Sequence, residues 1–166
     1  MSRIDKNQAV IDYLITCTDI YNNPLYFNLI NAKDNSIQVM TTSQDKVLNT
    51  TNIDGSVDKK FTFNIVIFKS ISDAEIVKPT GTDAPEYPTE NIEELDAVQK
   101  IIDWIEEQND LYNYPDFGEN CYIDKIDTTT EEPRFEGIDY EINPPLAMYS
   151  VSIEINYLDT SKVIFK

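Results

Sequence analysis

Residues 149–157 alternate strictly between apolar and polar side chains, and this pattern constrains the fold more than any other feature of the sequence. One set is apolar and gains Ala147 upstream: Ala147, Tyr149, Val151, Ile153, Ile155 and Tyr157. The other set is polar: Ser150, Ser152, Glu154 and Asn156. Successive side chains of a strand point to opposite faces of a sheet. The pattern therefore predicts an antiparallel strand with one face on a core and the other in solvent.

Five other segments are predicted to be strands or extended. Residues 60–68 are β-branched, aromatic and nearly uninterrupted, which is typical of a central strand. Residues 25–30 and 37–40 are apolar and flank Asp34-Asn35-Ser36, which predicts a hairpin. Residues 120–126 predict a strand, and residues 135–142 are either a strand or an extended segment.

Two segments carry the helical period. Apolar residues at spacings of three, four and seven predict an amphipathic helix over residues 3–18, which ends before Asn22-Asn23-Pro24. A second helix starts at a cap on Asn91, with Glu94 three residues later. Its apolar stripe is Ile92, Leu95, Val98, Ile101, Ile102 and Ile105.

These elements follow one another in the order α-β-β-β-α-β-β-β. We therefore expect an α+β fold, an antiparallel or mixed β-sheet with two amphipathic helices packed on one face. A chain of 166 residues that is 41% hydrophobic suits one domain, residues 1–166, better than two.

Three segments are expected to lie outside the predicted central sheet and helices. Residues 41–60 are polar and contain the turn signal Asp54-Gly55. Residues 72–91 are acidic and proline-rich and lack a hydrophobic period, which predicts a long loop that either makes an intermolecular contact or is mobile without a role. Residues 163–165 either add a short edge strand or dock elsewhere.

The charge balance restricts the partners. Thirteen Lys and Arg against 30 Asp and Glu give a formal net charge of −17, and no basic cluster is present. Wrapping around nucleic acid is disfavoured, because such binding relies on Lys and Arg displacing the phosphate counterions. No apolar run approaches the 18 or so residues that a membrane span needs, so we expect a cytosolic protein.

The sequence has few residues suited to catalysis or metal binding. The chain has no histidine, which removes the commonest general base and metal ligand. Cys17 and Cys121 lack a C-x-x-C partner and are expected to be reduced and buried. The four glycines form no phosphate-binding motif, and Asp54-Gly55-Ser56-Val57-Asp58 lacks the distal glutamate of a calcium loop. We therefore expect no enzyme, no cofactor and no metal site.

In element order, the chain resembles the tail terminator (tail completion) proteins of tailed bacteriophages, and related neck and minor capsid proteins look similar. The likeness rests on the helix from Ile4 to Cys17, on Asp54-Gly55 before the strand Phe61–Ile67, on the helix from Asn91 to Asn109, and on the closing strand Met148–Ile155. It covers most of the chain and depends on layout rather than on a diagnostic motif.

This resemblance implies a structural virion protein at the tail–neck junction, made in the host cytoplasm. Copies would form a hexameric ring that caps the tail tube and joins it to the head–tail connector, with a tail sheath as a further partner. DNA would pass through the lumen without specific binding, repelled by acidic residues, unless the acidity only maintains solubility. No chemistry and no membrane contact are implied.

A closed ring needs heterologous contacts, in which one surface of a subunit meets a different surface of the next. The candidate subunit or partner contacts are Asp54, Gly55, Pro79, Tyr87, Pro88, Val163 and Phe165. The alternative is a small acidic binding module, such as an inhibitor that mimics the charge of DNA, which would bind a basic partner as a monomer or dimer.

Overall fold

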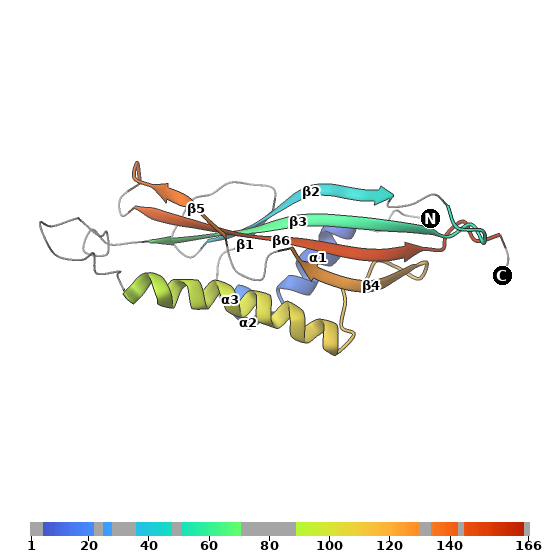
Figure 1. The fold of residues 1–166 in the computed structure, drawn as a ribbon, viewed down its shortest axis with the longest axis horizontal. Helices are drawn as coiled ribbons and strands as arrows, with labels where there is room; N and C mark the ends of the chain where they lie inside the picture. Colours follow the sequence, from blue (N-terminus) through green and yellow to red (C-terminus); the bar gives the residue numbers. More distant parts are fainter. Residues whose placement is uncertain are drawn as a thin grey trace, which may run out of the picture.

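The computed structural model describes residues 5–21, 25–27, 36–47, 51–70, 89–129, 134–142 and 145–164. The described residues form one six-stranded mixed sheet and three helices (Figure 1). The elements in chain order are α1 (Lys6–Leu14), α2 (Thr18–Tyr21), β1 (Leu25–Phe27), β2 (Ile37–Val47), β3 (Val57–Ser70), α3 (Thr89–Asp110), β4 (Cys121–Thr128), β5 (Arg134–Asp139) and β6 (Leu146–Asp159). The expected α+β fold is confirmed.

The sheet is built around β3 and β6, which pair antiparallel over their full lengths, from Val57 opposite Asp159 to Ser70 opposite Leu146. The strand order is β1-β2-β3-β6-β4. β5 also pairs with β6, so the far edge of β6 carries two strands. β4 lies along residues 153–159 of β6 and β5 along residues 146–150. In Figure 1 this leaves β5 near one end of β6 and β4 toward the other.

The alternation in β6 sets which face is buried. Its six predicted apolar residues are all buried. The four from Tyr149 to Ile155 lie opposite buried residues of β3: Phe61, Phe63, Ile65 and Ile67. The same cluster takes in Val10 and Leu14 of α1, Ile20 of α2 and Ile101 of α3. The helices therefore pack on one face of the sheet, as predicted. Full burial of each such aliphatic side chain contributes about 1.5–3 kcal/mol.

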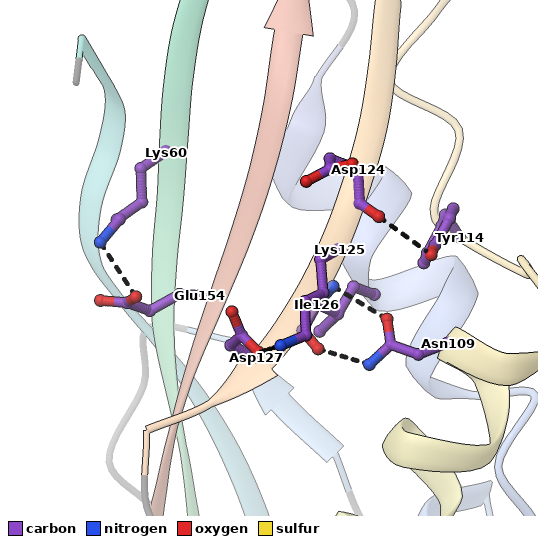
Figure 2. A network of polar contacts seen from close by, with 8 residues as sticks. All are labelled: Lys60, Asn109, Tyr114, Asp124, Lys125, Ile126, Asp127 and Glu154. Carbon is purple, nitrogen blue, oxygen red and sulfur yellow. Dashed lines mark hydrogen bonds and ion pairs between the residues drawn. The ribbon is translucent and has the colours of Figure 1, made fainter. Parts of the chain in front are cut away.

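The opposite face of β3 and β6 carries polar side chains. Asn64 accepts a hydrogen bond from the hydroxyl of Ser152 across the two strands (2.8 Å). Lys60 pairs with Glu154 at 2.9 Å, and both are partly exposed (Figure 2). This face therefore matches the polar half of the predicted alternation.

The first predicted helix is shorter than expected and is interrupted. The Asp5 carboxylate caps α1 by accepting from the amides of Asn7 (3.0 Å) and Gln8 (3.4 Å). The helix ends at Leu14, and a turn precedes α2. Here the hydroxyl of Thr16 donates to the carbonyl of Tyr13 (2.7 Å), a local bond that competes with the helical pattern.

The predicted hairpin is wrong, because β1 and β2 run parallel, with Leu25 opposite Ile37. Ser36, expected in the turn, is instead buried directly before β2, and its carbonyl accepts from the amide of Phe68 (3.1 Å). A tight turn cannot join parallel strands.

Three predicted boundaries are also wrong. β2 continues to Val47, so residues 41–47 belong to a strand rather than to the polar loop, and β3 begins at Val57. Backbone pairing with the long central strand outweighs the polar composition there. α3 begins at Thr89, so Asn91 lies inside the helix instead of capping it. The rest of the predicted loop, residues 72–88, lies outside the described residues.

The later strands agree better with prediction. β5 covers residues 135–139 of the segment expected to be strand or extended and begins one residue earlier, at Arg134. Both thiols are free, with Cys17 buried and Cys121 half-buried rather than buried. Among the helices that the structure describes, none is long and apolar enough to cross a membrane.

The outer edge of β4 is covered by side chains from the end of α3 and the segment after it (Figure 2). The Asn109 amide donates to the carbonyl of Ile126 (2.5 Å) and accepts from the amide of the same residue (2.9 Å). The Tyr114 hydroxyl donates to the carbonyl of Asp124 (3.2 Å). These bonds occupy backbone groups that an edge strand otherwise offers to another chain.

Candidate functional site

One end of the sheet gathers several of the predicted contact residues. Here the connection before β3 (residues 51–56) meets the segment after β6 (residues 160–164), and we call these two segments together the tip. The amide of Ile164 donates to the carbonyl of Asp54 (3.1 Å). The amide of Thr160 donates to the carbonyl of Asn120 (2.8 Å), which ties the tip to the start of β4.

Gly55 is required by this contact. Its φ is +92°, a region that L side chains rarely adopt. A Cβ on Gly55 would lie 2.5 Å from the carbonyl oxygen of Lys162, which is backbone and cannot rotate away. The turn signal Asp54-Gly55 is therefore also a packing signal.

Asp54 organises the turn. Its Oδ1 accepts from the amide (2.9 Å) and the hydroxyl (2.6 Å) of Ser56. These hydrogen bonds hold the pKa of the Asp54 carboxyl below its usual value. The Asn52 amide group donates to the Ser56 hydroxyl (3.1 Å) and, at 3.4 Å, to Asp58. The carboxylates here are thus used to shape the loop.

An ion pair lies directly behind the tip. Lys59 and Asp159, both half-buried, approach to 2.7 Å. Burial alone would raise the pKa of Asp159, but hydrogen bonds from Lys59 and Ser161 lower it to about 2. The ends of β3 and β6 that carry the tip are therefore joined by this ion pair as well as by the backbone hydrogen bonds between the two strands.

The tip displays aliphatic side chains. Ile53 is fully exposed and Ile164 is 76% exposed. A shallow cavity of about 640 Å³ beside them is lined by Asn52, Ile53, Asp54, Ser56, Asp58 and Leu158. Two exposed aliphatic side chains on an otherwise polar turn make the tip a candidate protein contact.

The tip holds three of the predicted contact residues. Asp54, Gly55 and Val163 are brought together, although residues 163–164 dock against the turn and form no strand. Pro79, Tyr87, Pro88 and Phe165 lie outside the described residues. The contact residues predicted from the sequence do not include Ile53. The feature that could have indicated it is an isolated aliphatic residue beside a turn, within a polar run.

A second group of exposed apolar side chains lies on β5 and directly after it. Phe135 is 54% exposed and packs on Tyr149, with ring centroids 5.7 Å apart, and Tyr140 is 62% exposed. We call Phe135 and Tyr140 the β5 patch. Because β5 pairs with the start of β6 and the tip follows its end, the two apolar surfaces lie at opposite ends of β6.

Neither a protein-family model nor a curated protein matches this chain. Within the residues that the structure describes, no group of three His, Cys, Asp or Glu side chains is placed to hold a metal ion.

Proposed function

We propose that the protein is a structural assembly subunit of the tail terminator type, which forms a ring on the end of a tail tube and joins it to the head–tail connector. The observation that carries the proposal is the placement of two different exposed apolar surfaces, the tip and the β5 patch, at opposite ends of β6. A heterologous contact needs two such surfaces on each subunit.

The dimensions favour a head-to-tail arrangement. β6 has 14 residues, and a rise of about 3.4 Å per residue separates its ends by roughly 45 Å. Surfaces so far apart cannot both take part in one small two-fold contact. Each is free to meet the other surface of a neighbouring copy, which yields a ring when the rotation closes.

The covered edge of β4 supports the same proposal. Asn109 and Tyr114 occupy backbone groups of β4, so pairing between copies along that edge is opposed. The net charge of −17 per copy keeps separate rings apart and discourages DNA from sticking to a lumen.

The test is the mass of the purified protein in solution, measured by light scattering with and without tail-tube protein. We expect a species near six subunits, formed alone or on tube ends. Ile53→Glu should reduce this species, because a carboxylate would have to be desolvated in the contact.

Leu111→Glu is the matched control, because Leu111 is also exposed (64%) but belongs to neither surface. A stable monomer whose mass does not change when tail-tube protein is added would refute the proposal and favour the acidic binding module instead. Equal loss of the assembled species in the two variants would refute the assignment of the tip.

A further inference from the structure

The only arginine that the structure describes lies beside the β5 patch. Arg134 begins β5, opposite Ser150 of β6, and its side chain is 72% exposed. Its Nε lies 3.4 Å from Oε1 of Glu136, and the same oxygen accepts a hydrogen bond from the Ser150 hydroxyl (2.5 Å). A guanidinium carries five N–H donors, so this one long contact leaves most of them available. The β5 patch therefore has a cation at its border.

A carboxylate that lacks such a cation lies beside the tip. Asp58 is half-buried, lines the tip cavity and accepts one weak hydrogen bond, from the side-chain amide of Asn52 at 3.4 Å. The next two residues of β3, Lys59 and Lys60, each pair with a carboxylate of β6. Among the residues that the structure describes, no lysine or arginine forms an ion pair with Asp58.

Arg134 and Asp58 lie on the same face of the sheet but toward opposite ends. Their partners on β6 are Ser150 and Leu158, and this even spacing places both side chains on the face opposite the helices. Eight residues at about 3.4 Å each separate the two positions by roughly 27 Å. The two charges therefore cannot pair within one copy. They can pair between two copies that meet end to end.

We propose that Arg134 of one copy pairs with Asp58 of the next copy, and that this ion pair determines which ends meet. The inference rests on the proposed ring and names the residues that specify its contact. Phe135 follows Arg134, and Ile53 lines the same cavity as Asp58, so an exposed apolar side chain flanks each charge. Neighbours that exclude water strengthen an ion pair. Arginine suits this role, because its planar fork can bond both oxygens of a carboxylate.

The same two charges oppose the wrong contacts. A tip against a tip would bring two Asp58 carboxylates together, and a β5 patch against a β5 patch would bring two Arg134 side chains together. Like charges in contact disfavour association, and such repulsion selects between partners. Copies with a net charge of −17 also repel one another, so a contact between them needs opposite charges where it forms. The pairing of Arg134 with Asp58 supplies these charges.

The test is a pair of charge reversals, followed by light scattering under the conditions in which the wild-type chain assembles. Arg134→Glu alone should lower the association constant between copies about tenfold or more, and so should Asp58→Arg alone, because each creates a like-charge contact. An equimolar mixture of the two variants should regain the assembled species. In a ring of six that alternates the variants, every contact again joins a cation to a carboxylate.

Lys125→Glu is the matched control. Lys125 is 58% exposed and pairs with Asp127 two residues later on β4, as Arg134 pairs with Glu136 on β5. This substitution changes the net charge by the same amount and disturbs the same kind of local pair, away from the tip and the β5 patch. It should leave the mass of the assembled species unchanged. Urea denaturation checks that each variant folds, and Asp58→Lys replaces Asp58→Arg if the latter does not.

Three results would overturn the pairing: an assembled species that persists in Arg134→Glu, an equal loss in Lys125→Glu, or a mixture that stays dissociated. Each of them leaves the assembly of the wild-type chain intact. Failure of the ion pair is therefore distinguishable from failure of the proposed ring. A wild-type chain that stays monomeric with and without tail-tube protein would refute both.

Discussion

Replacing Gly55 with alanine should loosen the tip, and the structure allows the size of the effect to be worked out. A non-glycine residue at positive φ costs about 1–2 kcal/mol in the backbone. The new Cβ must also move away from the Lys162 carbonyl, which it would otherwise approach to 2.5 Å. Moving that segment breaks the bond from the Ile164 amide to Asp54, worth about 0.5–1.5 kcal/mol net.

We therefore expect Gly55→Ala to lower the free energy of unfolding by about 2–3 kcal/mol, measured by urea denaturation. For a chain of this length, each 1 kcal/mol corresponds to a fall in Tm of about 2–4 °C. Hydrogen exchange at the Ile164 amide should accelerate as well, because that amide loses its partner.

Gly137→Ala separates the two causes. Gly137 also has a positive φ, +142°, but nothing lies within 4 Å of a Cβ placed there. It should show the backbone cost without the clash, and it should leave exchange at Ile164 unchanged. If the two variants were equally stable, or if Gly55→Ala matched the wild type, the packing argument for the tip would be refuted.

Three further predictions follow from the packing and the charges. Asn109→Ala should lower the free energy of unfolding by about 1–3 kcal/mol and speed exchange at the Ile126 amide, since both side-chain bonds to that residue are lost; unchanged exchange would contradict the role given to Asn109. Ile153→Ala should cost about 2–5 kcal/mol in urea denaturation, because its side chain is fully buried in the core; a cost below this range would mean that the core is looser than described. The pKa of Asp159 is lowered from 3.8 to about 2, so the stability that its carboxylate contributes is present above pH 3.8 and is lost as the pH falls toward 2. Asp159→Asn should remove that part of the acid dependence, which melting curves recorded at several pH values would show. An unchanged pH profile would contradict the pairing with Lys59.

The central strands and the long helix were predictable from sequence because their patterns reflect burial directly. The alternation around Ile153 survives in the fold, since residues two apart share a face of the sheet. The stripe through Ile101, Ile102 and Ile105 likewise lies in the core. In both cases a period in the sequence maps onto one buried surface.

The errors arose where long-range pairing decides the outcome. An apolar pattern does not distinguish a parallel from an antiparallel neighbour, so the sequence predicts a hairpin where β1 and β2 run parallel. The polar residues 41–47 form a strand only because β3 extends alongside them. The intrinsic strand propensity of residues 41–47 contains no information about this pairing with β3.

The candidate site shows the same division. Asp54-Gly55 was visible as a turn, but the approach of Lys162 to Gly55 joins residues far apart in sequence.

The most direct test of head-to-tail assembly is site-specific cross-linking between copies. Ile53→Cys marks the tip and Tyr140→Cys marks the β5 patch, each in a Cys121→Ser background, with Cys17 left in place because it is buried. The two variants are mixed and mildly oxidised, and the products are resolved by mass spectrometry. The account predicts disulfides that join the tip thiol of the Ile53→Cys variant to the β5-patch thiol of the Tyr140→Cys variant, abundant only in the mixture. Links only between identical positions, or no link above that of the Leu111→Cys control, would contradict assembly through opposite ends of β6.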